Sequence, residues 1–204
     1  MLQNTYIANR SSKGCSVSRS CVTFLSSKAL ISSITYPAFN SVGIKDMKIG
    51  KILLVLAMGL FLTLAAFNNS MTLQGTFAAV KSAVDMQGTF KVPVLMWRAI
   101  ENPALIWLCV AAIVITEAVA GLLCLWGAYR LWAARASAAN FNAAKTTAML
   151  GLSLCAVLYL LGFQAIAGEW FMLWQNRTAP TLDEAFRNFA SAVLLMLWLN
   201  TKDE

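Results

Sequence analysis

The stretch from Ala104 to Tyr129 reads ALIWLCVAAIVITEAVAGLLCLWGAY and contains one charged residue, Glu117, near its middle. A helix with about 20 apolar residues crosses a bilayer. Trp107 and Trp126 lie 19 positions apart, so a rise of ~1.5 Å per residue separates them by about 28 Å, close to the hydrocarbon thickness. Indole rings favour the two membrane interfaces. The stretch therefore predicts a transmembrane helix with a carboxylate near the bilayer centre.

The composition of the whole chain agrees with a membrane protein. Of the 204 residues, 59% are hydrophobic and 12% are charged, against about 25% charged residues in soluble domains. The net charge is +7, and residues 1–46 hold five basic residues and one acid, so most of the excess lies there. Contact with lipid head groups explains this charge, and a nucleic-acid partner is not expected.

The residue types exclude several classes of enzyme. Histidine is absent, which excludes histidine-ligated haem, the usual zinc hydrolase sites and Ser-His or Cys-His pairs. The five cysteines form no CxxC pair, and buried cysteine usually behaves as a small hydrophobe. We therefore predict no catalytic residue, no metal site and no cofactor.

Residues 1–46 are predicted to be a disordered leader outside the fold. They are rich in serine and basic residues, as in an organellar transit peptide. The interpretation we favour over a transit peptide is a misassigned start, because Met47 opens directly into an apolar run. A genuine disordered arm is the third reading. In each case the folded domain is 47–204.

The domain is predicted to be an all-α integral membrane four-helix bundle with a partly helical outer loop between helices 1 and 2. In that loop, Phe77, Val80 and Val84 recur at helical spacing, and Pro93 can begin a second short helix. The expected spans are about 49–67, 104–129, 146–167 and 182–199.

The basic residues near the span ends predict the orientation. Lys48 and Lys51 precede the first span, and a basic turn without acids is expected from Arg130 to Lys145. Both features place the N- and C-termini in the cytoplasm. The last residues, including Asp203, are expected in solvent.

Glu117 has no basic residue nearby in its span, so it is expected to be a neutral acid or to find partners on other helices. One interpretation is interhelical packing through hydrogen bonds to Thr63, Ser153 or Tyr159, which lie at similar depth. The other is a proton or cation relay, or a counter-charge for a partner's basic group.

A second polar group is expected at the outer face, consisting of Arg98, Glu101, Glu169 and Arg187. A structural ion pair between Glu169 and Arg187 is one interpretation. The other is an anionic ligand or quinone-like head group held by Arg98 and Arg187. The expected aromatic interface comprises Trp97, Trp107, Trp126, Trp170 and Trp174.

The chain from about Met47 to Leu199 resembles the bacterial predicted small integral membrane proteins of unknown function (domain-of-unknown-function family 2165). The resemblance implies four transmembrane helices and a bacterial inner-membrane location. It includes Glu117, Arg98, Glu169 and Arg187 among the matching positions, and it implies no reaction. The segments that carry it are Ala66-Phe67-Asn68-Asn69, Leu95-Met96-Trp97-Arg98-Ala99-Ile100, Glu117-Ala118 with Leu122-Leu123-Cys124, Gly168-Glu169-Trp170-Phe171 with Trp174-Gln175, and Ala185-Phe186-Arg187.

Two functions follow as hypotheses. The first is a non-enzymatic accessory or assembly component of a larger inner-membrane complex, with the lipid bilayer and other membrane protein subunits as partners. The alternative is a small transporter or ion-conducting oligomer that uses Glu117.

Overall fold

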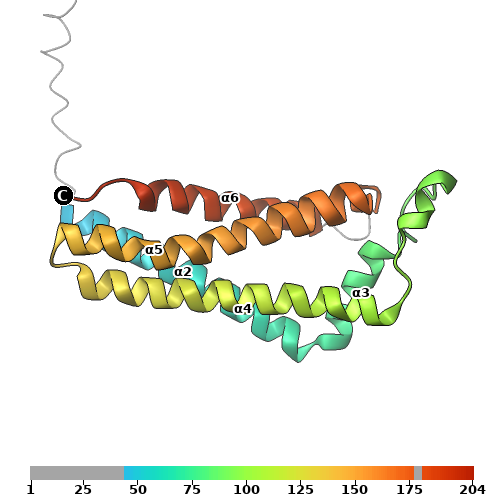
Figure 1. The fold of residues 1–204 in the computed structure, drawn as a ribbon, viewed down its shortest axis with the longest axis horizontal. Helices are drawn as coiled ribbons and strands as arrows, with labels where there is room; N and C mark the ends of the chain where they lie inside the picture. The colour runs from blue at the N-terminus through green and yellow to red at the C-terminus, as the bar shows by residue number, and fades with distance from the viewer. Residues whose placement is uncertain (1–43, 177–180) are drawn as a thin grey trace, which may run out of the picture. The chain divides into compact units, whose positions relative to one another are not determined.

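The computed structural model describes residues 44–176 and 181–204, and these ranges contain helices and connections but no strand. The expected leader therefore lies outside the described residues up to position 43. Figure 1 shows long helices that run side by side along most of the described domain.

Three helices in the described part of the chain are long and apolar enough to cross a membrane. They are α2 (Ile44–Met71), α4 (Pro103–Ala134), and α5 (Ala138–Val157) with its continuation η2 (Leu158–Trp170). In η2 the helix has the wider turn of a π-helix. Each helix contains a predicted span and extends beyond it, because the polar residues of the interface continue the backbone hydrogen bonds of the apolar segment.

The remaining long helix, α6 (Thr181–Asn200), contains the expected fourth span but is less apolar. Asp183, Glu184 and Arg187 all lie in its first two turns. Because of these charges α6 is not among the three membrane-capable helices, and its crossing of the membrane stays a prediction.

The connection between α2 and α4 is partly helical, as predicted. It contains α3 (Leu73–Val84) and the short 3-10 helix η1 (Pro93–Arg98). A second 3-10 helix, η3 (Leu173–Gln175), precedes α6. A small cluster of buried side chains joins α3 to the start of α4, comprising Val84, Met86, Ile106 and Phe171.

The long basic turn predicted between Arg130 and Lys145 is wrong, because most of that stretch is helical. Helix α4 continues to Ala134 and α5 begins at Ala138. Ser137 caps α5, and its side chain accepts a hydrogen bond from the Asn140 backbone amide. A single serine cap is sufficient to start a helix, so the connection needs few residues.

Helix α4 is the centre of the domain and packs against both α2 and α5. Glycines allow this close approach. A Cβ added at Gly121 would lie 2.6 Å from Thr63 Oγ1 of α2, and one at Gly127 would lie 2.7 Å from the Ala148 Cα of α5. Small residues at helix crossings are typical of membrane bundles, where van der Waals packing drives association.

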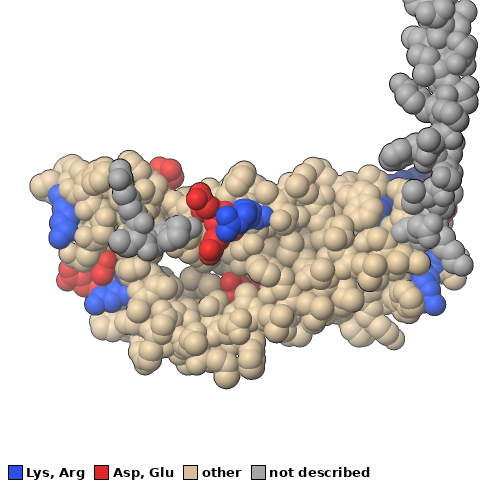
Figure 2. Space-filling model, turned by 180° about the vertical axis from the view of Figure 1, so that it is seen from behind, with Lys and Arg blue, Asp and Glu red and all other residues tan. Residues whose placement is uncertain are grey.

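We call one end of the domain the basic end and the other the loop end. The basic end contains the starts of α2 and α5 and the ends of α4 and α6. The loop end contains α3, η1 and η3 (Figure 1). Figure 2 shows that uncharged residues cover most of one face, with charged side chains near the ends and in one group between them. An apolar surface of this kind is suited to contact with lipid.

Candidate functional site: Glu117 and the cavity beside it

Glu117 joins three helices. Its side chain projects from α4, and the residue is 3% exposed. Oε2 accepts a hydrogen bond from Asn69 Nδ2 of α2 at 2.8 Å, and Oε1 accepts one from the Tyr159 hydroxyl of η2 at 3.2 Å. Asn188 of α6 lies within hydrogen-bonding reach of the Tyr159 hydroxyl. The carboxylate is therefore the centre of a polar group within otherwise apolar helices.

Of the three partners predicted for Glu117, the structure places only Tyr159 in contact with it. Thr63 donates instead to the Gly59 carbonyl of its own helix, and Ser153 contacts Met196 Sδ at 4.0 Å. Asn69 was missed because the first helix was expected to end near Phe67. It continues to Met71, which keeps Asn69 on the helical surface facing α4. The sequence did contain one indication of a role for Asn69, since the Asn68-Asn69 pair belongs to a segment that resembles the family.

A cavity of about 540 Å³ adjoins Glu117 on the side of the loop end. Six elements line it: the second half of α2, α3, the first half of α4, η2, η3 and the start of α6. On the opposite side of Glu117 the core is tightly packed, with Leu62, Ala120 and Cys124 buried. Glu117 thus lies between this cavity and the tightly packed contact of α2 with α4.

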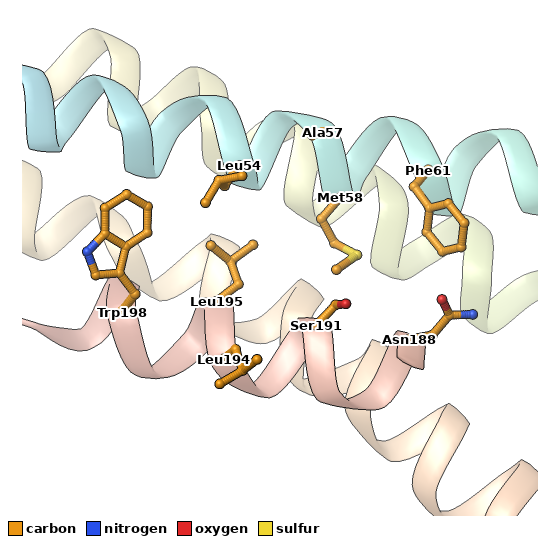
Figure 3. A pocket seen from close by; sticks show the side chains of 9 residues that line it. All are labelled: Leu54, Ala57, Met58, Phe61, Asn188, Ser191, Leu194, Leu195 and Trp198. Carbon is orange, nitrogen blue, oxygen red and sulfur yellow. The ribbon is translucent and has the colours of Figure 1, made fainter. Parts of the chain in front are cut away.

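A groove of about 500 Å³ runs between α2 and α6 (Figure 3). The α2 wall is apolar, whereas α6 adds two polar side chains, Asn188 and Ser191. Phe61 and Asn188 line both the groove and the cavity, so the two spaces adjoin each other. The other groove residues are Leu54, Ala57, Met58, Leu194, Leu195 and Trp198.

The four polar residues predicted at the outer face do not form a cluster. Among the described residues, Arg187 pairs with Glu184 of its own helix at 3.9 Å, and Glu169 forms no ion pair. Arg98 donates to the Trp170 carbonyl at 3.5 Å. Glu101 is exposed at the loop end. One helical turn brings Glu184 to Arg187 without any long-range folding, which explains the local pair.

The predicted interface tryptophans lie in aromatic pairs. The Arg98 guanidinium lies over the rings of Trp97 and Trp170, at 5.7 and 4.6 Å from their centroids. At the loop end Trp107 also packs against Phe77 and Trp174 against Phe90, whereas Trp126 stacks on Tyr129 toward the basic end. Amphipathic rings at two levels of a helical domain are typical of membrane interfaces.

A polar cluster that the sequence did not predict closes the basic end. The expectation that Asp203 ends in solvent is wrong, since it is 5% exposed. Its carboxylate contacts Lys51 Nζ at 2.7 Å and Lys145 Nζ at 2.5 Å, and Asn142 hydrogen-bonds to its backbone. Burial alone would raise the pKa of Asp203, but hydrogen bonds from Lys145 and Lys51 outweigh it and hold the pKa below its usual value.

Comparison with curated protein sequences and with solved structures gives no match. One family model, described as "Predicted small integral membrane protein (DUF2165)", matches residues 47–202. The match covers all the helices described above except the first residues of α2. The chain therefore belongs to this family of predicted small integral membrane proteins.

Proposed function

We propose that this protein is a non-enzymatic accessory or assembly component of a larger membrane complex, and that a transmembrane helix of a partner subunit packs between α2 and α6. The groove of Figure 3 is the observation that carries the proposal. It lies beside the membrane-capable helix α2, and its volume is comparable to that of sites which bury a ligand or a row of side chains.

The chemistry of the groove suits a helix rather than a soluble partner. Leu54 and Leu194 are 49% and 66% exposed on its walls. Between them, Ala57 and Ser191 are small enough for another backbone to approach closely. Asn188 adds an amide that can hydrogen-bond across helices, an interaction worth about 0.6–2 kcal/mol in a membrane. Small and polar residues in one groove are the usual composition of a helix–helix interface in lipid.

The proposal includes α6 as a fourth transmembrane helix in a bacterial inner membrane. Its charged residues lie in the first two turns, where they reach the interface, and Ala192, Leu195 and Leu199 pack into the core. Four spans place both termini on one side. The basic residues near Lys51 and Lys145 favour the cytoplasm for that side.

Native purification tests the accessory role. The full chain, extracted from its own membrane in a mild detergent, should co-purify with a different membrane protein in a defined stoichiometry by native mass spectrometry. A monomer, or a complex containing only copies of this chain, would contradict the proposal. A tag on the C-terminus should be avoided, because Asp203 is buried.

A small transporter or ion-conducting oligomer is the second candidate, and the cavity that reaches Glu117 favours it. The packed core beyond Glu117 argues against a continuous polar path through one copy of the chain. Proton- or cation-coupled flux in liposomes distinguishes the two. Flux that Glu117→Gln abolishes would favour the transporter, whereas flux that Glu117→Gln leaves unchanged would remove the carboxylate from the mechanism.

A further inference from the structure

The cavity beside Glu117 has a charge pattern that packing alone does not explain. Two of its lining residues are acidic, Glu117 and Glu184, and none of its described lining residues is a lysine or an arginine. The ion pair of Glu184 with Arg187 is long, at 3.9 Å, and exposed. Glu117 has no ion pair among the described residues. Within residues 44–176 and 181–204, the cavity therefore offers a negative group without a cation in its lining.

The hydrogen bonds of Glu117 leave room for a ligand. A carboxylate has about four acceptor sites on two oxygens. Asn69 and Tyr159 each occupy one of these sites, one on each oxygen. The Asn69 amide nitrogen can only donate, whereas the Tyr159 hydroxyl can either donate or accept. A carboxylate in an apolar surrounding takes up a proton unless a counter-charge is present, so a cation in the cavity would stabilise the ionised form of Glu117.

The rest of the cavity suits a bulky apolar group. Tyr159 and Phe163 both line it, with ring centroids 5.4 Å apart, and Phe171 adds a third ring. Aromatic faces attract cations that have lost part of their hydration. A volume of about 540 Å³ lies within the range of sites for small organic molecules, roughly 300–1,000 Å³. Hydrated metal ions or bare protons would leave most of this space unused.

We propose that the cavity binds a lipophilic organic cation, with the positive group at Glu117 and the apolar body among the aromatic rings. This site adjoins the α2–α6 groove at Phe61 and Asn188, but Glu117 and the aromatic rings of η2 line the cavity alone. A ligand of this class enters from the lipid phase or the loop end, because buried side chains of α2 and α4 pack together on the other side of Glu117.

Equilibrium dialysis of the purified full-length protein in detergent tests the site. The probe is tetraphenylphosphonium, and the matched control is tetraphenylborate, which has a similar shape and the opposite charge. We expect saturable, stoichiometric binding of the cation and none of the anion. Equal binding of both ions, or no saturable binding of tetraphenylphosphonium, would overturn the proposal.

Variants then locate the cation. Glu117→Gln removes a charged partner of the ligand and should weaken the binding of tetraphenylphosphonium by roughly tenfold to a hundredfold. Glu169→Gln is the control, because Glu169 is exposed and lies outside the cavity lining. Ala112→Phe keeps the carboxylate but places a ring in the space one to two turns from it, so it should also weaken binding. Unchanged affinity in a folded Glu117→Gln or Ala112→Phe variant would contradict the assignment.

These outcomes are independent of the accessory function. Binding of tetraphenylphosphonium by a protein that purifies without a partner would support the cavity site and contradict the accessory function. A protein with a partner but no cation binding would give the opposite result.

Discussion

Lys51 and Asp203 are separated by 152 positions in the sequence and by 2.7 Å between Nζ and Oδ2. The contact fixes the end of the chain to the first turns of α2. Lys145 of α5 contacts the same carboxylate oxygen, and both lysines donate to the Thr201 carbonyl. Three helices are therefore held together at the basic end by one acidic residue.

Replacing that acid should destabilise the domain. Asp203→Ala leaves two buried ammonium groups without a counter-charge. We expect this to lower the free energy of unfolding by about 2–3 kcal/mol. The value is below the usual range for buried pairs because the cluster lies at the end of the domain. Thermal unfolding in detergent measures the change. Glu204→Gln is the control, because Glu204 is exposed. Equal melting temperatures for both variants would show that the cluster contributes little.

The same cluster predicts a dependence of stability on pH. The pKa of Asp203 is lowered in the folded state, so the unfolded chain, with a pKa of about 3.9, takes up the proton first as the pH falls. The stabilisation is complete above the unfolded pKa and is lost as the pH falls through the folded pKa. Melting temperatures should therefore drop below about pH 4 in the wild type. Asp203→Asn should show a smaller drop over the same range.

The hydrogen bonds of Glu117 predict coupling between helices. Glu117→Leu leaves Asn69 and Tyr159 without their acceptor and should destabilise the domain by about 1–2 kcal/mol. A double-mutant cycle with Tyr159→Phe should give a coupling energy of about 0.6–1.7 kcal/mol. The matched cycle of Glu117→Leu with Ser153→Ala should give none, because Ser153 contacts Met196 instead. Additivity in both cycles would argue against the observed geometry.

The glycine contact between α4 and α5 predicts a steric effect. A Cβ at Gly127 would lie 2.7 Å from both the Cα and the amide nitrogen of Ala148, which are backbone atoms that cannot rotate away. Gly127→Ala should therefore cost about 1–3 kcal/mol of unfolding free energy. Gly75→Ala is the control, since the nearest atom to its added Cβ is 3.9 Å away. It should be neutral or slightly stabilising, as alanine favours a helix.

Much of the fold could be predicted because membrane helices have a strong local signal. Runs of apolar residues at 49–67, 104–129 and 146–167 lie within the three membrane-capable helices. The fourth run is weaker, since Asp183, Glu184 and Arg187 occupy the first turns of α6. Helix ends were less predictable, because polar residues such as Asn69 continue a helix once a neighbouring helix supplies a partner.

Long-range polar contacts were the least predictable part of the site. Tyr159 was expected beside Glu117 because depth in the membrane restricts the possible partners. Nothing in the sequence near Asp203 indicates that its carboxylate returns to α2 and α5, since the contact depends on how α6 packs. The expected link between Glu169 and Arg187 was wrong for the opposite reason, because Glu184 is available to Arg187 one turn away.

Photo-crosslinking from the groove tests the accessory function most directly. Leu194, which lines the groove and is 66% exposed, would be replaced by p-benzoylphenylalanine in the full chain in its own membrane. The control position is Leu150 on α5, which is 56% exposed and lies outside the groove. The account predicts an adduct with a different membrane protein from Leu194 and little or none from Leu150. Adducts only with lipid or with a second copy of this chain would contradict it.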